Sequence, residues 1–388
     1  MELRELTLRG RGKDVQIFRE SNIDRTSYAI GYKDPRLLGT RFQLRLLDAF
    51  NSDGHERRLE IERPFFALDS RFSVDAAGDD AREQIAAYDG GDVRLRFTHD
   101  RKRLEGTYGF SPGLAGDRVW RLRAGFLYQE DAYADPVLPA GFTDARLPVD
   151  RKLCGPKIVW ERQVVRYILV RNFEKLDRDE DYNLGPTTMV SAVLSREAFG
   201  ASDDSLYVQA SHTAGAGIGK ASTLLYGGTF DGQLFGSEPA NAVATVSADL
   251  FDQRFEYHTI HAGLRLSAGL DLEPGRELLL GGDSGLRAFD ARRFDGDRLA
   301  VATLEDRLFR GWTLFHLLDV GFAAFADVGD CWRASGGPDG LHTDVGLGIR
   351  LGVRKSAHAG LVNLDVSYPL DRVDGERAIM FSVGKTDF

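Results

Sequence analysis

The chain has 388 residues, enough for two or three ordinary domains or for one large barrel. Its net charge of −9 and its pI of about 5.5 argue against a nucleic-acid-binding protein, which would normally present a basic face. Mean hydropathy is −0.28 and no apolar run approaches the ~18 residues of a membrane-spanning helix, which excludes a helical membrane protein. A membrane β-barrel stays open, because its strands alternate apolar and polar residues.

The N-terminal residues are charged and contain no apolar stretch of the kind found in a signal peptide, so we expect none here. From Val15 onward, alternation of period two dominates the chain. It is clearest in residues 41–46, 93–97, 119–128, 261–272 and 344–354. One face of these runs is apolar over as many as five or six positions, about 9–11 residues of strand, enough to cross a bilayer when tilted. The other face carries arginines and acids suited to a hydrated lumen, although a large soluble β-protein remains the alternative.

Counting these runs predicts a single all-β domain over residues 1–388, a transmembrane antiparallel β-barrel of about 16 strands. The runs begin near Val15, Tyr28, Phe42, Leu59, Phe72, Val93, Arg103, Trp120, Val159, Met189, Leu206, Leu224, Val243 and Leu264, with five more after residue 290. Since this series exceeds sixteen, we expect some neighbouring runs to belong to one strand or to be loop excursions.

Two segments interrupt the alternation. Ala132–Lys157 holds four prolines and is predicted to be a long loop. Cys154 lies in it, and its spacing from Cys331 fits no metal motif, although one disulfide between the two is possible.

The second segment, Arg171–Gly185, is charged and is predicted to be a solvated acidic loop tip. Its alternate aspartates between residues 177 and 181 resemble a calcium-binding loop. However, Tyr182 stands where such a loop needs glycine, and Thr188 stands where it needs glutamate. We therefore predict no metal site, and the sequence shows no cofactor site.

Residues 281–289 read GGDSGLRAF, and Gly-Asp-Ser-Gly also surrounds the nucleophilic serine of trypsin-like proteases. A nucleophilic serine needs a base and a group that orients the base. None of the eight histidines stands in the Ala-Ala-His-Cys context of that family, and Gly285 is followed by Leu286 rather than by a second glycine. We therefore predict no catalytic residue at Ser284 and no enzyme.

The second half of this stretch, Leu286-Arg287-Ala288-Phe289, is similar to the Val-Arg-Gly-Phe/Tyr motif of the BamA/TamA superfamily, the bacterial outer-membrane assembly barrels of the bacterial surface antigen family. That motif lies in the long sixth extracellular loop, and Ala288 departs from the family's usual glycine. The resemblance implies that the loop folds into the barrel lumen. There, Arg287 would pair with acidic residues on two strands.

Two further motifs match those strands: Phe325, Asp327 and Gly329 fit Phe-x-Asp-x-Gly, and Glu305 and Arg307 fit Glu-x-Arg. Periodicity agrees, because Asp319, Phe325, Asp327 and Gly329 share one strand face, as do Glu305 and Arg307. Residues 31–40, 62–66, 362–370 and 381–388 also resemble segments of the family, so the resemblance spans nearly the whole chain. A guanidinium paired with carboxylates in the lumen would lock loop six, either stabilising the barrel only or also gating it.

The resemblance further implies a lateral gate, where the first and last strands meet. We expect Val15 and Ile17 on the first strand, and Phe381, Gly384 and Phe388 on the last, to line this gate. Gly384 has no side chain to pack and would weaken strand pairing there.

The implied function is to help insert or translocate other outer-membrane proteins through this gate, in the bacterial outer membrane. The expected partners are outer-membrane lipids, unfolded outer-membrane clients and periplasmic proteins, with no nucleic acid. No periplasmic POTRA domain is expected, because the first predicted strand begins within about fifteen residues of Met1. The alternatives are a passive pore, a secretion translocator or an anchor for a fused domain, and a soluble β-rich enzyme or binding protein.

Overall fold

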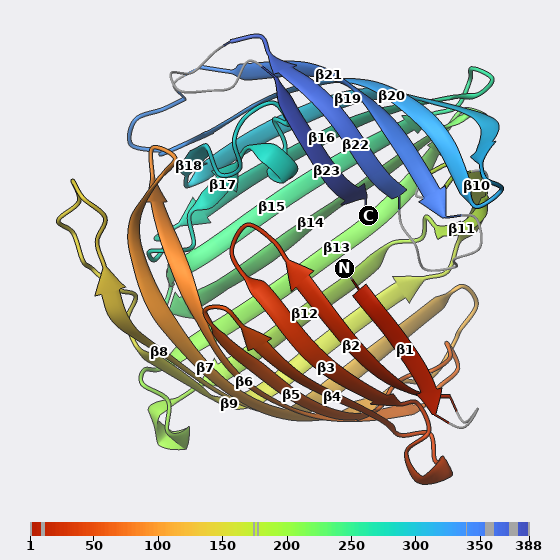
Figure 1. The fold of residues 1–388 in the computed structure, drawn as a ribbon. Helices are drawn as coiled ribbons and strands as arrows, with labels where there is room; N and C mark the ends of the chain where they lie inside the picture. The colour runs from red at the N-terminus through yellow and green to blue at the C-terminus, as the bar shows by residue number, and fades with distance from the viewer. Residues whose placement is uncertain are drawn as a thin grey trace.

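A computed structural model describes residues 2–8, 12–173, 175–176, 178–338, 340–353, 361–371 and 379–386. In this part of the chain, one antiparallel sheet of nineteen strands curves around a central space (Figure 1), and two further sheets have two strands each. The helical elements there are three short 3-10 turns: η1 (Leu37–Gly39), η2 (Glu197–Phe199) and η3 (Gly282–Ser284). The predicted all-β, antiparallel class is confirmed.

Each strand of the main sheet pairs with its neighbours in chain order, so the sheet is an up-and-down meander. Its strands are β1 (Glu2–Leu8), β2 (Lys13–Ser21), β3 (Thr26–Asp34), β4 (Gln43–Asn51), β5 (Gly54–Arg63), β6 (Phe72–Asp89), β7 (Asp92–Phe110), β8 (Arg118–Val137), β9 (Arg151–Val164), β12 (Thr187–Ser195), β13 (Ser205–Ile218), β14 (Ser222–Phe235), β15 (Glu238–Asp252), β16 (His258–Leu270), β19 (Arg298–Leu314), β20 (Leu318–Trp332), β21 (His342–Val353), β22 (Leu361–Pro369) and β23 (Met380–Thr386). The small sheets are β10 (Tyr167–Arg171) with β11 (Asp179–Asn183), and β17 (Leu278–Leu280) with β18 (Phe294–Gly296).

The main sheet therefore has nineteen described strands where the sequence predicted about sixteen. The runs near Val93 and Arg103 belong to one long strand, β7. The strand that the sequence missed is β1. Its apolar residues lose the period-two phase because a bulge or irregularity shifts the register against β2 between Leu3 and Leu6.

The proline-rich loop is shorter than predicted. β8 runs to Val137 and β9 begins at Arg151, so Pro136 and Pro156 both lie within strands. Pro156 pairs with Phe126 in the β8–β9 ladder, but it lies just beyond the β9–β12 ladder, whose last pair joins Lys157 to Val193.

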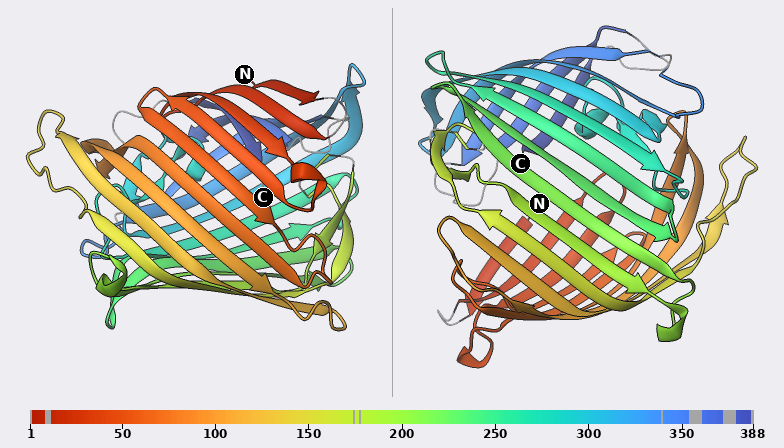
Figure 2. Two further views of the ribbon diagram at one scale, coloured as in Figure 1. Left: turned by 90° about the horizontal axis from the view of Figure 1, so that it is seen from below. Right: turned by 180° about the vertical axis from the view of Figure 1, so that it is seen from behind.

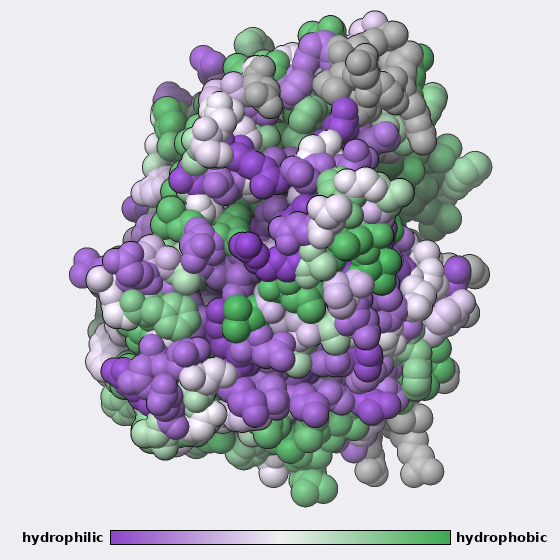
Figure 3. Space-filling view, turned by 90° about the vertical axis from the view of Figure 1, so that its left-hand side faces the viewer, coloured by the Kyte–Doolittle hydropathy of each residue, from purple (hydrophilic) through white to green (hydrophobic). Residues whose placement is uncertain are grey.

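The two faces of the sheet differ as the alternation predicted. Outward residues are apolar and exposed, as Leu304 (55%) and Leu347 (67%) show. Inward residues include charged side chains that are nearly fully buried, among them Glu305 (4%) and Arg350 (1%). Figure 3 shows that hydrophilic side chains dominate the middle of one view of the molecule, where smaller hydrophobic patches lie among them. Among the described residues, no helix has the length and apolar character to cross a membrane.

The two edges of the sheet are β1 and β23, and no ladder joins them among the described residues. Figure 2 shows the curved sheet from two further sides, with both termini marked. Because β2 pairs with both β1 and β3, Val15 and Ile17 lie on the second strand. The prediction that these two residues belong to the first strand is therefore wrong.

Candidate functional site: an arginine network in the interior

The long connection between β16 and β19, residues 271–297, folds into the space enclosed by the sheet, where β17 and β18 lie (Figure 1). Three of its side chains, Leu280, Leu286 and Phe289, are fully buried. They pack against an apolar patch of the wall made by Leu299, Val301 and Cys331. Burial of these apolar side chains therefore anchors the loop to the wall on both sides of Arg287.

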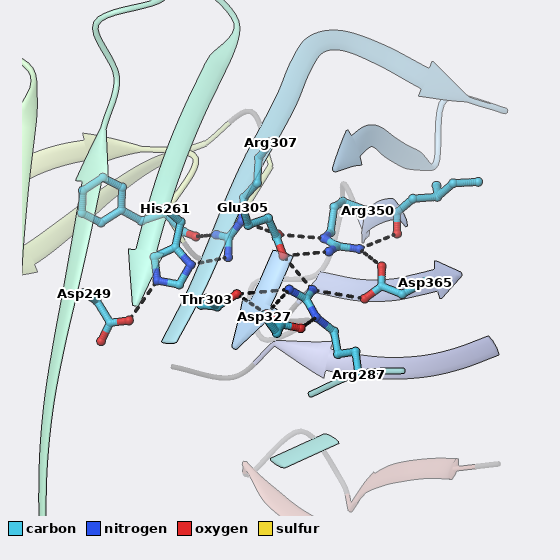
Figure 4. A network of polar contacts seen from close by, with 11 residues as sticks. Asp249, His261, Arg287, Thr303, Glu305, Arg307, Asp327, Arg350 and Asp365 are labelled. Atoms are coloured by element: carbon cyan, nitrogen blue, oxygen red, sulfur yellow. Dashed lines mark hydrogen bonds and ion pairs between the residues drawn. The ribbon is translucent and has the colours of Figure 1, made fainter. Parts of the chain in front are cut away.

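Arg287 meets acidic residues of two adjacent strands (Figure 4). Its Nε and Nη2 donate to the two oxygens of Asp327 on β20, at 2.7 and 3.0 Å. Its Nη1 donates to Glu305 on β19 at 2.8 Å, and Nη2 also reaches the Thr303 hydroxyl at 3.2 Å. The bidentate contact suits the planar guanidinium and fixes its orientation.

An aromatic ring completes the surroundings of this guanidinium. The central carbon of the Arg287 guanidinium lies 3.3 Å from the ring centroid of Phe325. On β21, Gly346 leaves room for this ring, since a Cβ there would lie 2.2 Å from Phe325 Cζ. Phe325 therefore stacks against the cation in addition to lining the wall.

The network continues beyond Arg287 to two more arginines. Glu305 accepts from Arg307 Nε at 2.8 Å and from Arg350 Nη2 at 3.1 Å. Arg350 Nη1 donates to Asp365 on β22 at 2.5 Å, and Asp365 also lies 3.5 Å from Arg287. Three guanidinium groups thus meet three carboxylates, those of Glu305, Asp327 and Asp365, whose formal charges balance. Asp344 is a further buried carboxyl beside them.

Backbone groups of the loop are held as well. The Ala288 N–H donates to Asp344 on β21 at 3.1 Å, and the Arg287 carbonyl accepts from the Ser367 hydroxyl on β22 at 2.9 Å. Ala288 is fully buried and its backbone is not in the left-handed region, so alanine fits at this position without strain. The loop is thereby attached to β19, β20, β21 and β22.

Burial alone would lower the pKa of Arg287, because it penalises the charged form. The hydrogen bonds and charges of Asp327 and Glu305 outweigh that effect and raise the pKa above its ordinary value. Arg287 therefore carries its positive charge at neutral pH.

The structure thus brings together the predicted residues 286–289, Glu305, Arg307, Phe325 and Asp327. Gly329 lies nearby on β20, where a Cβ would lie 2.6 Å from the Ala300 carbonyl oxygen, so glycine lets β19 approach. Two further residues of this site, Arg350 and Asp365, were not predicted. Alternation placed Arg350 on the polar face of its strand, but neither partner could be named without the register of β19, β21 and β22.

The predicted gate residues of the last strand lie at the C-terminal edge. Phe381 is 76% exposed. Gly384 pairs with Asn363 of β22, and a Cβ added to it would have no other atom within 4 Å. Phe388 lies outside the described residues.

Other motifs of the sequence have ordinary surroundings. The Ser284 hydroxyl donates to the Gly281 carbonyl oxygen at 2.8 Å. Cys154 and Cys331 are both free and buried. Among the residues that the structure describes, no group of three or more His, Cys, Asp or Glu side chains could hold a metal ion; Asp177 of the acidic segment is outside them.

Comparison with protein-family models finds no match, and neither does comparison with curated proteins. Among solved structures, the chain is similar to BamA from Haemophilus ducreyi lacking POTRA domains 1–3, with a TM-score of 0.53 and 13% identity over 96% of this chain and 68% of that one. It is also similar to CdiB from Escherichia coli, with a TM-score of 0.48 and 14% identity over 95% of this chain and 66% of that one. At such identity, the BamA likeness shows a common barrel fold and nothing finer.

Proposed function

We propose that this chain is the barrel of a bacterial outer-membrane assembly or translocation factor, which helps other outer-membrane proteins to insert or cross through the seam between its first and last strands. The observation that carries this proposal is the pair of sheet edges, β1 and β23, which no ladder joins among the described residues. The BamA-like fold and the exposed apolar outer face support placement in the outer membrane.

The seam has the chemistry needed to receive another strand. An edge strand presents N–H and C=O groups that can pair with an incoming chain, which most proteins avoid and strand-adding proteins use. β23 is short, with seven residues, and contains Gly384, whose missing side chain weakens pairing there. An unfolded outer-membrane client would add its own strands to these edges before leaving into the lipid.

The Arg287 network serves this function by holding the wall next to the seam. Its hydrogen bonds link the loop to β19, β20 and β22 and link β21 to β22, so they tie together the strands that lead to the β23 edge. Lipids contact the outer face, and periplasmic partners deliver clients to the barrel. A passive pore, a secretion translocator and a membrane anchor are the competing functions.

The proposal is tested by reconstitution into liposomes and by timing the folding of a small, urea-unfolded barrel protein added from outside. Both native cysteines are first replaced by alanine, and cysteine pairs are then placed with one member in β1 and one in β23. We expect the reduced protein to accelerate client folding and the oxidised, crosslinked protein to lose this acceleration.

A matched disulfide within the wall, far from both edges, is provided by Val246→Cys with Leu266→Cys, since these exposed residues face each other on β15 and β16. This crosslink should leave the acceleration unchanged. Full acceleration by the β1–β23 crosslinked protein would exclude the seam as the route. If the uncrosslinked protein is folded and heat-modifiable but gives no acceleration, a pore or an anchor is the better assignment.

A further inference from the structure

A second element enters the interior from the opposite strand end. The connection between β9 and β12, residues 165–186, forms the β10–β11 hairpin, whereas the Arg287 loop connects strands at the other end. The sequence predicted a solvated acidic loop here, but Val170, Phe173, Leu176 and Leu184 are all buried. The prediction is wrong for these apolar residues, which find partners on distant strands, whereas Asp179 and Asp181 are exposed as expected.

The first of these contacts fixes the hairpin to the middle of the wall. Phe173, 2% exposed, stacks on Phe251 of β15 with ring centroids 4.4 Å apart. Phe251 stacks in turn on His261 of β16 at 4.7 Å. Val170 joins the same apolar cluster, so the hairpin rests on the inner face of β15 and β16.

The second contact reaches the strands beside the C-terminal edge. Leu176 packs with Phe309 of β19 and Leu361 of β22 in a cluster in which all three side chains are buried. Arg178 Nη2 also lies 3.5 Å from the Val353 carbonyl oxygen at the end of β21. A segment that starts between β9 and β12 thus touches the strand next to β23, across seven intervening strands of the sheet order from β13 to β21.

Polar contacts join the hairpin to the arginine network. Arg307 Nη1 donates to the Phe173 carbonyl oxygen at 3.3 Å. The Nε of the same arginine donates to Glu305 (Figure 4). The Glu180 carboxylate accepts from the Phe173 and Lys175 N–H groups at 3.1 and 3.2 Å, which shapes the turn that presents this carbonyl. The contacts therefore run without a break from the hairpin to Arg287.

We propose that the 165–186 hairpin is an internal latch that holds β21 and β22 against β15–β19 at the strand end opposite the Arg287 loop. An isolated two-stranded hairpin is barely stable in water, so its order here depends on the contacts that it makes with the wall. By the same contacts it restrains the strands that flank the seam. Leu176 supports the inner side of β22, whose ladder partners are β21 and the short edge strand β23, so its removal should weaken β22 first.

The test is amide hydrogen exchange, measured by mass spectrometry on the full chain in liposomes, for the variant Leu176→Asp. A carboxylate cannot remain in the cluster with Phe309 and Leu361, so we expect exchange in residues 361–369 and 167–183 to rise by about tenfold or more. The matched control is Leu169→Asp, on the same hairpin but 67% exposed, which should leave exchange in residues 361–369 unchanged. Unaltered exchange there in the folded Leu176→Asp protein would overturn the latch.

A crosslink tests the same contact without removing it, in case Leu176→Asp does not fold. Leu176→Cys with Leu361→Cys, with both native cysteines replaced by alanine, should oxidise to a disulfide and slow exchange in residues 361–369. Reductant should restore the original rate. Failure of this pair to crosslink in the folded protein, or a crosslink that leaves exchange unchanged, would also overturn the proposal. Neither readout requires client insertion, so the latch and the proposed function can fail separately.

Discussion

Arg287 holds its loop in place through the pairing of its positive charge with the buried carboxylates around it. Its side chain is 19% exposed, and the carboxylate of Asp327 beneath it is 3% exposed. In such surroundings each charge depends on its partners, because water cannot replace them. The loop position is therefore set by chemistry that a shorter or uncharged side chain cannot supply.

Removing the Arg287 guanidinium should destabilise the barrel. Arg287→Ala leaves Asp327 buried without its bidentate partner, a loss that costs about 3–5 kcal/mol when a buried pair is broken. Denaturant titration of the protein in liposomes measures the free energy of unfolding. Arg287→Lys should recover part of it, since lysine restores the charge but not the two-point contact with Asp327.

The matched control for this variant is Arg276→Ala in the same loop. Arg276 pairs with Asp231 at 2.8 Å, but both side chains are about one third exposed (36% and 33%), so its removal should cost about 1 kcal/mol or less. Equal losses for Arg287→Ala and Arg276→Ala would show that the network contributes nothing special to stability.

At this scale the sequence predicted the residues that short motifs carry, but not the partners set by strand register. Arg287, Glu305, Phe325 and Asp327 each stand in a recognisable pattern. Asp365 stands in an ordinary alternating strand, and its role arises because β21 and β22 place it across from Gly348, two residues before Arg350. Alternation tells which face a side chain occupies, not which strand's side chain it meets.

Among the strands, two glycines have opposite consequences for pairing. Gly329 of β20 lies against backbone, since a Cβ would be 2.6 Å from the Ala300 carbonyl oxygen and 3.0 Å from Val301 Cα on β19. Gly384 of β23 has no atom within 4 Å of that position. The first glycine therefore permits a close approach, and the second leaves a strand weaker than its neighbours.

We predict that alanine at these two positions changes stability in opposite directions. Gly329→Ala must push β19 and β20 apart and should destabilise by roughly 1–3 kcal/mol. Gly384→Ala meets open space and should stabilise by roughly 0.5–1 kcal/mol, since glycine within a strand costs about that much. The free energy of unfolding in liposomes measures both, and a loss of stability in Gly384→Ala would contradict an open position at the edge.

Strand positions were largely predictable because each strand must bury one face and expose the other. Strand β1 was not predicted, because its register shift breaks that alternation. The burial of the β10–β11 hairpin was not predicted either, because it depends on residues more than a hundred positions away, such as Arg307 and Leu361. The charged composition of this hairpin predicted a solvated loop, whereas its tertiary contacts bury its apolar residues.

For the whole molecule, the exposure of apolar residues on the outer face does not by itself distinguish a face in contact with lipid from one in contact with water. Leucine is exposed both on the strands, as at Leu347 of β21, and in turns, as at Leu38 of η1 (91%). In a soluble β-protein, a charged residue would be tolerated at either place. In a membrane barrel only the turn would tolerate it, because the middle of a strand faces hydrocarbon.

We therefore predict that Leu347→Arg destabilises the liposome-embedded protein by roughly 2–4 kcal/mol, the cost of an arginine near the bilayer midplane, whereas Leu38→Arg has almost no effect. Leu347 lies near the centre of β21, between Ala324 and Val366 on the adjacent strands, so its arginine could not easily reach either interface. Denaturant titration of both variants in the same lipid gives the comparison. If neither substitution changed the free energy of unfolding, this face would lie in water and the soluble alternative would be favoured. The proposed route through the seam into the membrane would then be excluded as well.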